Sequence, residues 1–129
     1  MMDFTVKPPY HISSMAMILF GLSNLADSGT TDDITVAQVK KHVYDGDLID
    51  FLTEKGGGVF GNGLLKSSSQ KGFADWYVGR IRDLCVSMEG RERRKYAIQK
   101  RGICLLISYT AEIIQEGKDL TLQLPLTPP

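Results

Sequence analysis

The sequence predicts a single domain that is mainly α-helical and carries a small β-hairpin. Apolar residues recur every three or four positions in several segments, which is the pattern of helices that bury one face. The pair Gly90-Arg91 lies between two short runs and favours a two-residue hairpin turn. The length of 129 residues, with 43% hydrophobic and 23% charged residues, suits one domain around one core.

Both ends of the chain are expected to lie outside this domain. A Pro-Pro pair disfavours helix in residues 1–10, which are predicted to form an extended arm. The domain itself is assigned to residues 11–118. In residues 119–129 leucine recurs at every second position, which predicts an extended tail able to add an edge strand.

Three helices are predicted in the first half of the domain. The first covers His11–Ala26 and is apolar over more than one stripe, so it belongs either at the centre of the core or in a dimer interface. Thr35 and Gln38 have the spacing of a capping box and start a short helix over Val36–Tyr44. A further short helix is predicted over Leu48–Lys55.

A glycine-rich stretch and a longer amphipathic helix follow. Gly56–Leu65 predicts a flexible surface loop or a loose hairpin, and it lacks the Gly-Lys-Ser/Thr ending of a phosphate-binding loop. In Gln70–Leu84, large apolar residues recur at helical spacing. Trp76 and Tyr77 fit this spacing and are interpreted as core residues rather than as a platform for stacked bases.

The end of this helix is ambiguous. Cys85–Glu89 can either finish the helix or begin the first strand of the hairpin, and Glu92–Ile98 would be the returning strand. A strong apolar stripe after Arg101 predicts a last helix that ends at Gly117.

Charge is distributed unevenly although the net charge is zero. Residues 66–101 hold ten Lys/Arg against four Asp/Glu, and every arginine lies between Arg80 and Arg101. A guanidinium group can bind phosphate or a base edge through two hydrogen bonds, which lysine cannot do. A local basic patch of this kind is typical of a nucleic-acid contact.

Other function classes find little support. Cys85 and Cys104 lie in apolar-periodic segments and are expected to be free thiols, and no metal site or cofactor is predicted. His11 and His42 belong to no catalytic signature, so an enzyme is not expected. No secretory signal or membrane-spanning stretch is evident, which favours a cytoplasmic protein.

The segment Arg94–Gly102 resembles the junction between the wing and the last helix of winged helix-turn-helix proteins, notably the PadR-like and MarR-like regulators. The resemblance implies a winged-helix-like domain with Gln70–Leu84 as the recognition helix. Val36–Tyr44 would be the helix before it, and Ile34 the first short strand. It also implies a protein that binds double-stranded DNA as a transcriptional regulator. The wide apolar surface of the first helix, together with the last helix, predicts a homodimer, whose two-fold symmetry would let two wings address two half-sites.

The expected DNA contacts fall into two groups. Lys/Arg side chains and hydroxyl or amide donors at a helix start can bind phosphates, and exposed helix residues can reach base edges. The first group comprises Lys66, Ser68, Ser69, Gln70 and Lys71 around the start of the recognition helix, and Arg82 on the exposed side of the same helix. The second group lies in the hairpin and comprises Arg91, Arg93, Arg94 and Lys95.

Two other readings of the basic cluster remain open. The hairpin can be a solvated charged element balanced by Glu89 and Glu92, or it can contact an acidic protein partner. For the whole chain, the alternative to DNA binding is a protein-interaction module, such as an adaptor or a phage-type inhibitor.

Overall fold

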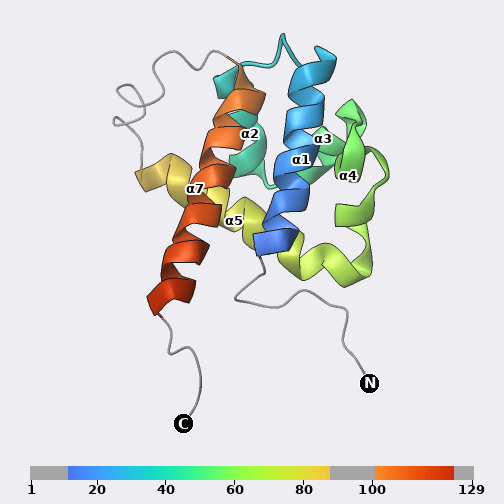
Figure 1. Cartoon of the computed structure of the whole chain (residues 1–129). Coiled ribbons are helices and arrows are strands. Elements are labelled where there is room, and N and C mark those ends of the chain that lie inside the picture. Colours follow the sequence, from blue (N-terminus) through green and yellow to red (C-terminus); the bar gives the residue numbers. More distant parts are fainter. Residues whose placement is uncertain (1–11, 88–100, 124–129) are drawn as a thin grey trace.

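A computed structural model describes residues 12–87 and 101–123 of the chain, and the side chains of residues 14–87 and 101–118 (Figure 1). The described residues form a small all-α domain. Its elements are α1 (Ile12–Ser28), α2 (Val36–Asp45), α3 (Leu48–Lys55), α4 (Gly58–Gly61), the 3₁₀ turns η1 (Leu64–Lys66) and η2 (Ser68–Gln70), α5 (Lys71–Ser87) and α7 (Gly102–Gln123).

The predicted fold class, mainly α with a β-hairpin wing, is wrong. Residues 12–87 and 101–123 contain no strand, and their β-type pairing is limited to one isolated antiparallel bridge between Thr35 and Arg101. α5 stays helical through Ser87, because Leu84 and Cys85 still pack in the core. The returning strand expected at Glu92–Ile98 lies outside the described residues.

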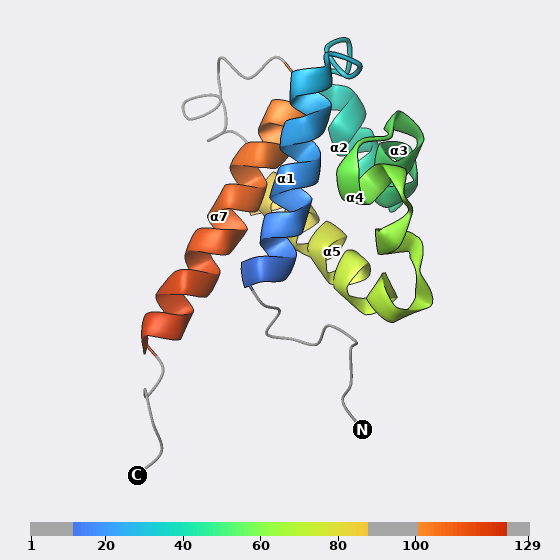
Figure 2. The same ribbon diagram turned by 45° about the vertical axis from the view of Figure 1, so that its right-hand side comes forward.

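The core forms where three long helices meet. α1 and α7 lie side by side and antiparallel, and α5 crosses them (Figures 1 and 2). Each helix contributes a buried apolar stripe, as the three- and four-residue spacing in the sequence requires. The largest fully buried side chains on these helices are Ile18, Leu22 and Leu25 of α1, Phe73, Tyr77 and Ile81 of α5, and Ile103 and Tyr109 of α7.

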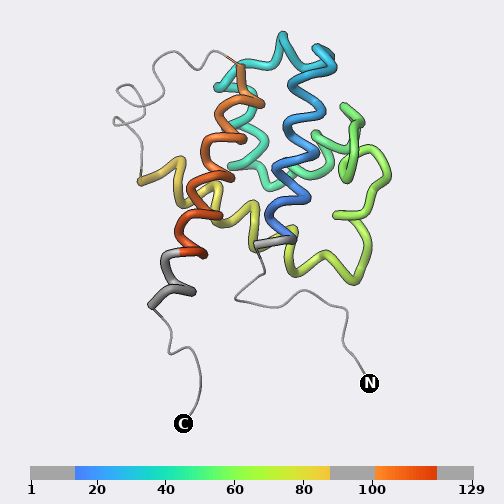
Figure 3. Tube along the Cα trace, in the orientation of Figure 1, coloured from blue at the N-terminus to red at the C-terminus, as the bar shows by residue number. Residues whose placement is uncertain are grey.

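The glycine-rich segment is not the surface loop that the sequence predicts. It holds the short helix α4, whose Val59 and Phe60 are buried. α4 packs against α1 at Gly21, where a Cβ atom would lie only 2.7 Å from a ring carbon of Phe60. From α3 the chain turns through α4 and then continues through η1 and η2 into α5 (Figure 3).

Helix boundaries follow the sequence closely where local hydrogen bonds set them. The capping box is confirmed: the Gln38 amide donates to Thr35 Oγ1 at 3.1 Å, and the Thr35 amide donates to Gln38 Oε1 at 2.8 Å. α2 ends at Gly46, whose φ of 82° suits glycine. α7 continues to Gln123, past the Gly117 at which an end was predicted.

Both cysteines are free, as the sequence predicts. Cys85 is buried in α5, and Cys104 is partly buried in α7. Among the residues that the structure describes, no helix combines the length and the apolarity that a membrane span requires.

Candidate nucleic-acid interface

The structure brings together three of the cations named as DNA contacts. Lys66 ends η1, Lys71 begins α5, and Arg82 follows on the same helix. All three line one open pocket of about 490 Å³ between α5 and the α2–α3 region. The second predicted group, Arg91, Arg93, Arg94 and Lys95, lies outside the described residues.

One face of α5 forms a wall of this pocket. The lining residues of α5 are spaced by three or four positions, so they lie on one side of the helix. Apolar and charged side chains alternate along this face. The α5 residues in the lining are Lys71, Ala74, Asp75, Val78, Gly79 and Arg82.

The remaining wall comes from the start of α3, from Gly46 between α2 and α3, and from η1. Ile49 and Leu65 give it an apolar surface, and Gly46 adds backbone without a side chain. Asp50 and Lys66 complete the lining. The lining therefore contains five charged residues beside four apolar ones.

The two lysines of the rim are neutralised by neighbouring carboxylates. Lys66 Nζ lies 3.0 Å from Asp50 Oδ1, and Lys71 Nζ lies 2.8 Å from Asp75 Oδ2. The hydrogen bond with Asp75 raises the pKa of the Lys71 ammonium group above its usual value. All four side chains are at least half exposed, and such surface pairs contribute only about 0–1 kcal/mol. These ion pairs therefore contribute little to the stability of the fold.

Arg82 differs from the two lysines. Its Nη2 donates a hydrogen bond of 3.1 Å to the carbonyl oxygen of Val43, near the C-terminal end of α2. Within the described part of the chain, no carboxylate lies at ion-pair distance from Arg82. The guanidinium is thus positioned by a neutral acceptor and keeps N–H donors for an anion.

The polar residues before α5 lie in η2 and in the residue that precedes it. Ser67 Oγ donates to the carbonyl oxygen of Leu64 at 2.7 Å, and it makes no capping hydrogen bond to η2. Ser68 and Ser69 are exposed. Gln70 Oε1 is buried and has no hydrogen-bond partner within the described residues. Ser68 and Ser69 therefore remain accessible, whereas the acceptor atom of Gln70 does not.

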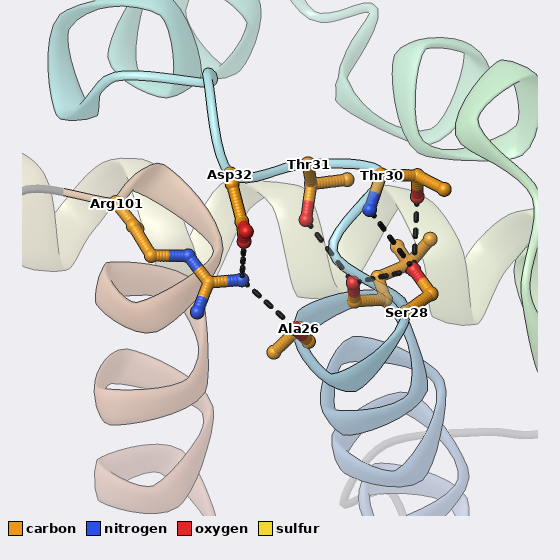
Figure 4. Close-up of polar contacts among 7 residues, drawn as sticks. Ala26, Ser28, Thr30, Thr31, Asp32 and Arg101 are labelled. Atoms are coloured by element: carbon orange, nitrogen blue, oxygen red, sulfur yellow. Dashed lines mark hydrogen bonds and ion pairs between the residues drawn. The ribbon is translucent and has the colours of Figure 1, made fainter.

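Arg101 is a structural residue that the sequence pattern does not reveal. Its Nη2 lies 2.6 Å from Asp32 Oδ1 and donates to the carbonyl oxygen of Ala26 at 3.0 Å (Figure 4). The amide of the next residue, Gly102, donates to the carbonyl oxygen of Ile34 at 2.8 Å. We call these contacts the Arg101 anchor. They join the start of α7 to the turn between α1 and α2.

The turn that receives Arg101 is itself held by side-chain hydrogen bonds. Thr31 is fully buried, and its hydroxyl donates to the carbonyl oxygen of Leu25 at 3.2 Å. Ser28 Oγ donates to the same carbonyl at 2.8 Å and lies 2.9 Å from Thr30 Oγ1 (Figure 4). The carbonyl of Leu25, in the last turn of α1, is thereby satisfied, which favours a defined turn.

A second arginine of the basic cluster also has a structural partner. Arg80 Nη2 lies 2.6 Å from Glu116 Oε2, which ties α5 to α7, and Arg80 Nη1 lies 3.3 Å from Asp83 Oδ2. Arg80 and Arg101 are therefore engaged within the domain. The sequence could not separate them from the other arginines, because Glu116 and Asp32 are distant along the chain.

The positive charge of the chain is concentrated between α5 and α7. Residues 12–87 and 101–123 hold nine Lys/Arg and twelve Asp/Glu, whereas residues 88–100 hold five Lys/Arg and two Asp/Glu. We call residues 88–100 the basic segment. It carries a net charge of +3, and the described part of the chain carries −3.

Comparison with protein-family models, with curated proteins and with solved structures finds no match for this chain. The function is therefore argued from the residues and their geometry.

Proposed function

We propose that this protein binds double-stranded DNA through the basic segment and acts as a small cytoplasmic transcriptional regulator. The separation of charge supports this function best: a helical body with a net charge of −3 continues into thirteen residues with a net charge of +3. Lys/Arg contacts with phosphates provide the sequence-independent part of DNA affinity. The acidic body disfavours other approaches and directs DNA toward the basic segment.

The Arg101 anchor supports the same proposal. Asp32 and the Ala26 carbonyl hold Arg101 at the point where the basic segment enters α7. The anchor therefore fixes the position in the domain at which the chain that carries Arg91, Arg93 and Arg94 joins α7.

Electrophoretic mobility shift with duplexes of several sequences tests this proposal over a range of salt. We expect Arg93→Ala with Arg94→Ala to weaken binding to every duplex. The slope of log K against log salt should fall by about 0.9 for each phosphate contact that is lost. Lys55→Ala with Lys118→Ala removes two exposed charges from the helical body and serves as the matched control. Wild-type protein that shows no salt-dependent binding to any duplex would overturn the proposal.

A second candidate is a protein-interaction module, and the exposed apolar face of α1 favours it. Phe20 is 73% exposed and Met17 is 36% exposed, and the two residues lie one turn apart. Exposed apolar side chains that cluster in this way mark contact surfaces. This face is also our candidate for the contact in a homodimer, which the two half-sites of a DNA operator would require.

Two measurements separate the candidates. If both the wild type and Phe20→Ser are retained on a DNA resin and elute with salt, the result supports DNA binding through the basic segment. The interaction module is supported by two results together. An acidic protein co-purifies with the wild type but not with Phe20→Ser, and the wild type is not retained on the DNA resin. Sedimentation of the wild type and of Phe20→Ser reports whether the α1 face holds a dimer together.

A further inference from the structure

We propose that the surface formed by α4, α1 and α7 binds a second copy of this chain in a two-fold dimer. We call this surface the three-helix face. The inference rests on the proposed function only in that two half-sites of a DNA operator need two copies. The features that carry it belong to the helical body: a lack of charge, the exposure of Phe20 and the small side chains nearby.

The three helices of this face are neighbours in space. α7, α1 and α4 lie next to one another in this order, and α5 crosses behind α1 and α7 (Figures 1 and 2). Gly21 contacts α4 on one flank of α1, and the Ala26 carbonyl accepts from Arg101 on the other flank. Phe20 lies on the outward side of α1 between these two flanks.

The segments that build the face share a lack of charge. Residues 12–26, 56–65 and 102–111 contain no Asp, Glu, Lys or Arg, although 23% of the whole chain is charged. Depletion of charged residues at the core of the contact distinguishes a protein–protein interface from the rest of a protein surface. The composition of the three-helix face is therefore that of an interface.

The lack of charge also indicates which partner fits. DNA and an acidic protein both carry charges, and the face offers no opposite charge to pair with them. Contact would remove water from those charges without compensation. A second copy presents the same uncharged surface, so two faces can meet without repulsion and without an unpaired charge. Of these partners, the second copy matches the face best.

The side chains of the face also suit a contact with an identical surface. Phe20 is 73% exposed, and its neighbours one helical turn away, Ala16 and Ser23, are small. On the accessible side of α7, Cys104 and Ala111 are small as well. Small side chains let a facing helix approach closely, and a large ring can pack against them. In a two-fold dimer each copy supplies both the ring and the small side chains.

The size of the face indicates how strong the contact should be. Residues 14–26 of α1 extend over about 18 Å, and α1 with α7 is about 20 Å wide. This area is smaller than the roughly 800 Å² that each partner contributes to a standard interface. We therefore expect a reversible dimer that dissociates at micromolar concentration.

Sedimentation equilibrium of the full chain without DNA, over a wide range of concentration, tests the proposal. The wild type should show a monomer–dimer equilibrium. Phe20→Glu should raise the dissociation constant by about a hundredfold or more, because it places two like charges in the uncharged contact. Val86→Glu is the matched control at an exposed apolar residue of α5, and it should leave the dissociation constant unchanged.

A mixing experiment distinguishes a second copy from any other partner. Phe20→Glu and Phe20→Lys should each be monomeric with the circular dichroism spectrum of the wild type. An equal mixture of the two should form a heterodimer, because the charges that meet are then opposite.

Two outcomes would overturn the proposal. One is a wild type that stays monomeric throughout the range, which leaves the three-helix face to a different protein. The other is a dimer that Phe20→Glu does not weaken. Duplex binding is measured separately by mobility shift, so failure of the dimer and failure of DNA binding remain distinguishable.

Discussion

The hydroxyl of Tyr77 on α5 lies 2.9 Å from the hydroxyl of Thr110 on α7, and both side chains are fully buried. This hydrogen bond joins the two helices that border the basic segment. A buried polar group without a hydrogen-bond partner destabilises a fold. Each of these hydroxyls is the hydrogen-bond partner of the other, which offsets the cost of burying both. The pair therefore helps to set how α5 and α7 pack.

Removal of the Tyr77 hydroxyl alone should destabilise the protein. Tyr77→Phe leaves Thr110 Oγ1 buried without its partner, which costs about 1–3 kcal/mol. Tyr77→Phe combined with Thr110→Val removes both hydroxyls, so the double variant should be more stable than Tyr77→Phe. Urea denaturation of the three proteins measures the free energies of unfolding. A double variant less stable than Tyr77→Phe would contradict the assigned pairing.

Tyr77 should also make stability depend on alkaline pH. Burial raises the pKa of its phenol above the ordinary value of 10.0. The folded state therefore keeps a proton that the unfolded chain releases, so the stabilising effect is complete below pH 10 and declines as pH rises above it. Thermal denaturation between pH 8 and pH 11 should show a falling Tm. The fall should be smaller in Tyr77→Phe than in the wild type.

Two glycine substitutions should have opposite effects on stability. At Gly102 a Cβ atom would lie 2.3 Å from Val39 Cγ2 and 2.6 Å from the Thr35 carbonyl oxygen, so Gly102→Ala must displace the start of α7. Gly79→Ala meets no such atoms and should stabilise α5 by up to about 1 kcal/mol. Calorimetry that finds Gly102→Ala as stable as the wild type would contradict the close approach of α7 to α2.

The Arg101 anchor should contribute to both stability and DNA binding. Arg101→Ala removes the ion pair with Asp32 and the hydrogen bond to Ala26, and should cost about 1–2 kcal/mol because the side chain is partly exposed. Lys118→Ala is the control for loss of one exposed charge. Hydrogen exchange at the turn between α1 and α2 should accelerate in Arg101→Ala only.

Short-range patterns in the sequence predicted short-range structure well. The capping box of Thr35 and Gln38 needs two residues three positions apart, and both of its hydrogen bonds form. The amphipathic spacing that placed Tyr77 in the core is confirmed in the same way, since helix periodicity sets which side of α5 is buried. The prediction of a glycine-rich surface loop was wrong, because burial of Val59 and Phe60 in α4 overrode the local turn preference. The β-hairpin was also a wrong prediction for the described residues, which contain no strand.

The candidate site also combines features that the sequence predicts with features that depend on the tertiary structure. Lys66, Lys71 and Arg82 were recognised from their charge, but their convergence on one pocket depends on the packing of α5 against α2 and α3. Their different partners are also a tertiary property. Asp50 neutralises Lys66 from another element, and Val43 holds Arg82 from a third.

What the sequence determined by itself was composition, charge distribution and the periodicity of each helix, which are properties of neighbouring residues. It therefore identified a single, mostly helical domain and the basic segment between α5 and α7. Only the tertiary structure decided that α4 fills the space beside Gly21, that Arg101 anchors the start of α7, and that Lys66, Lys71 and Arg82 line one pocket. Each of these depends on contacts between residues far apart in the chain, which exist only once the helices have packed together.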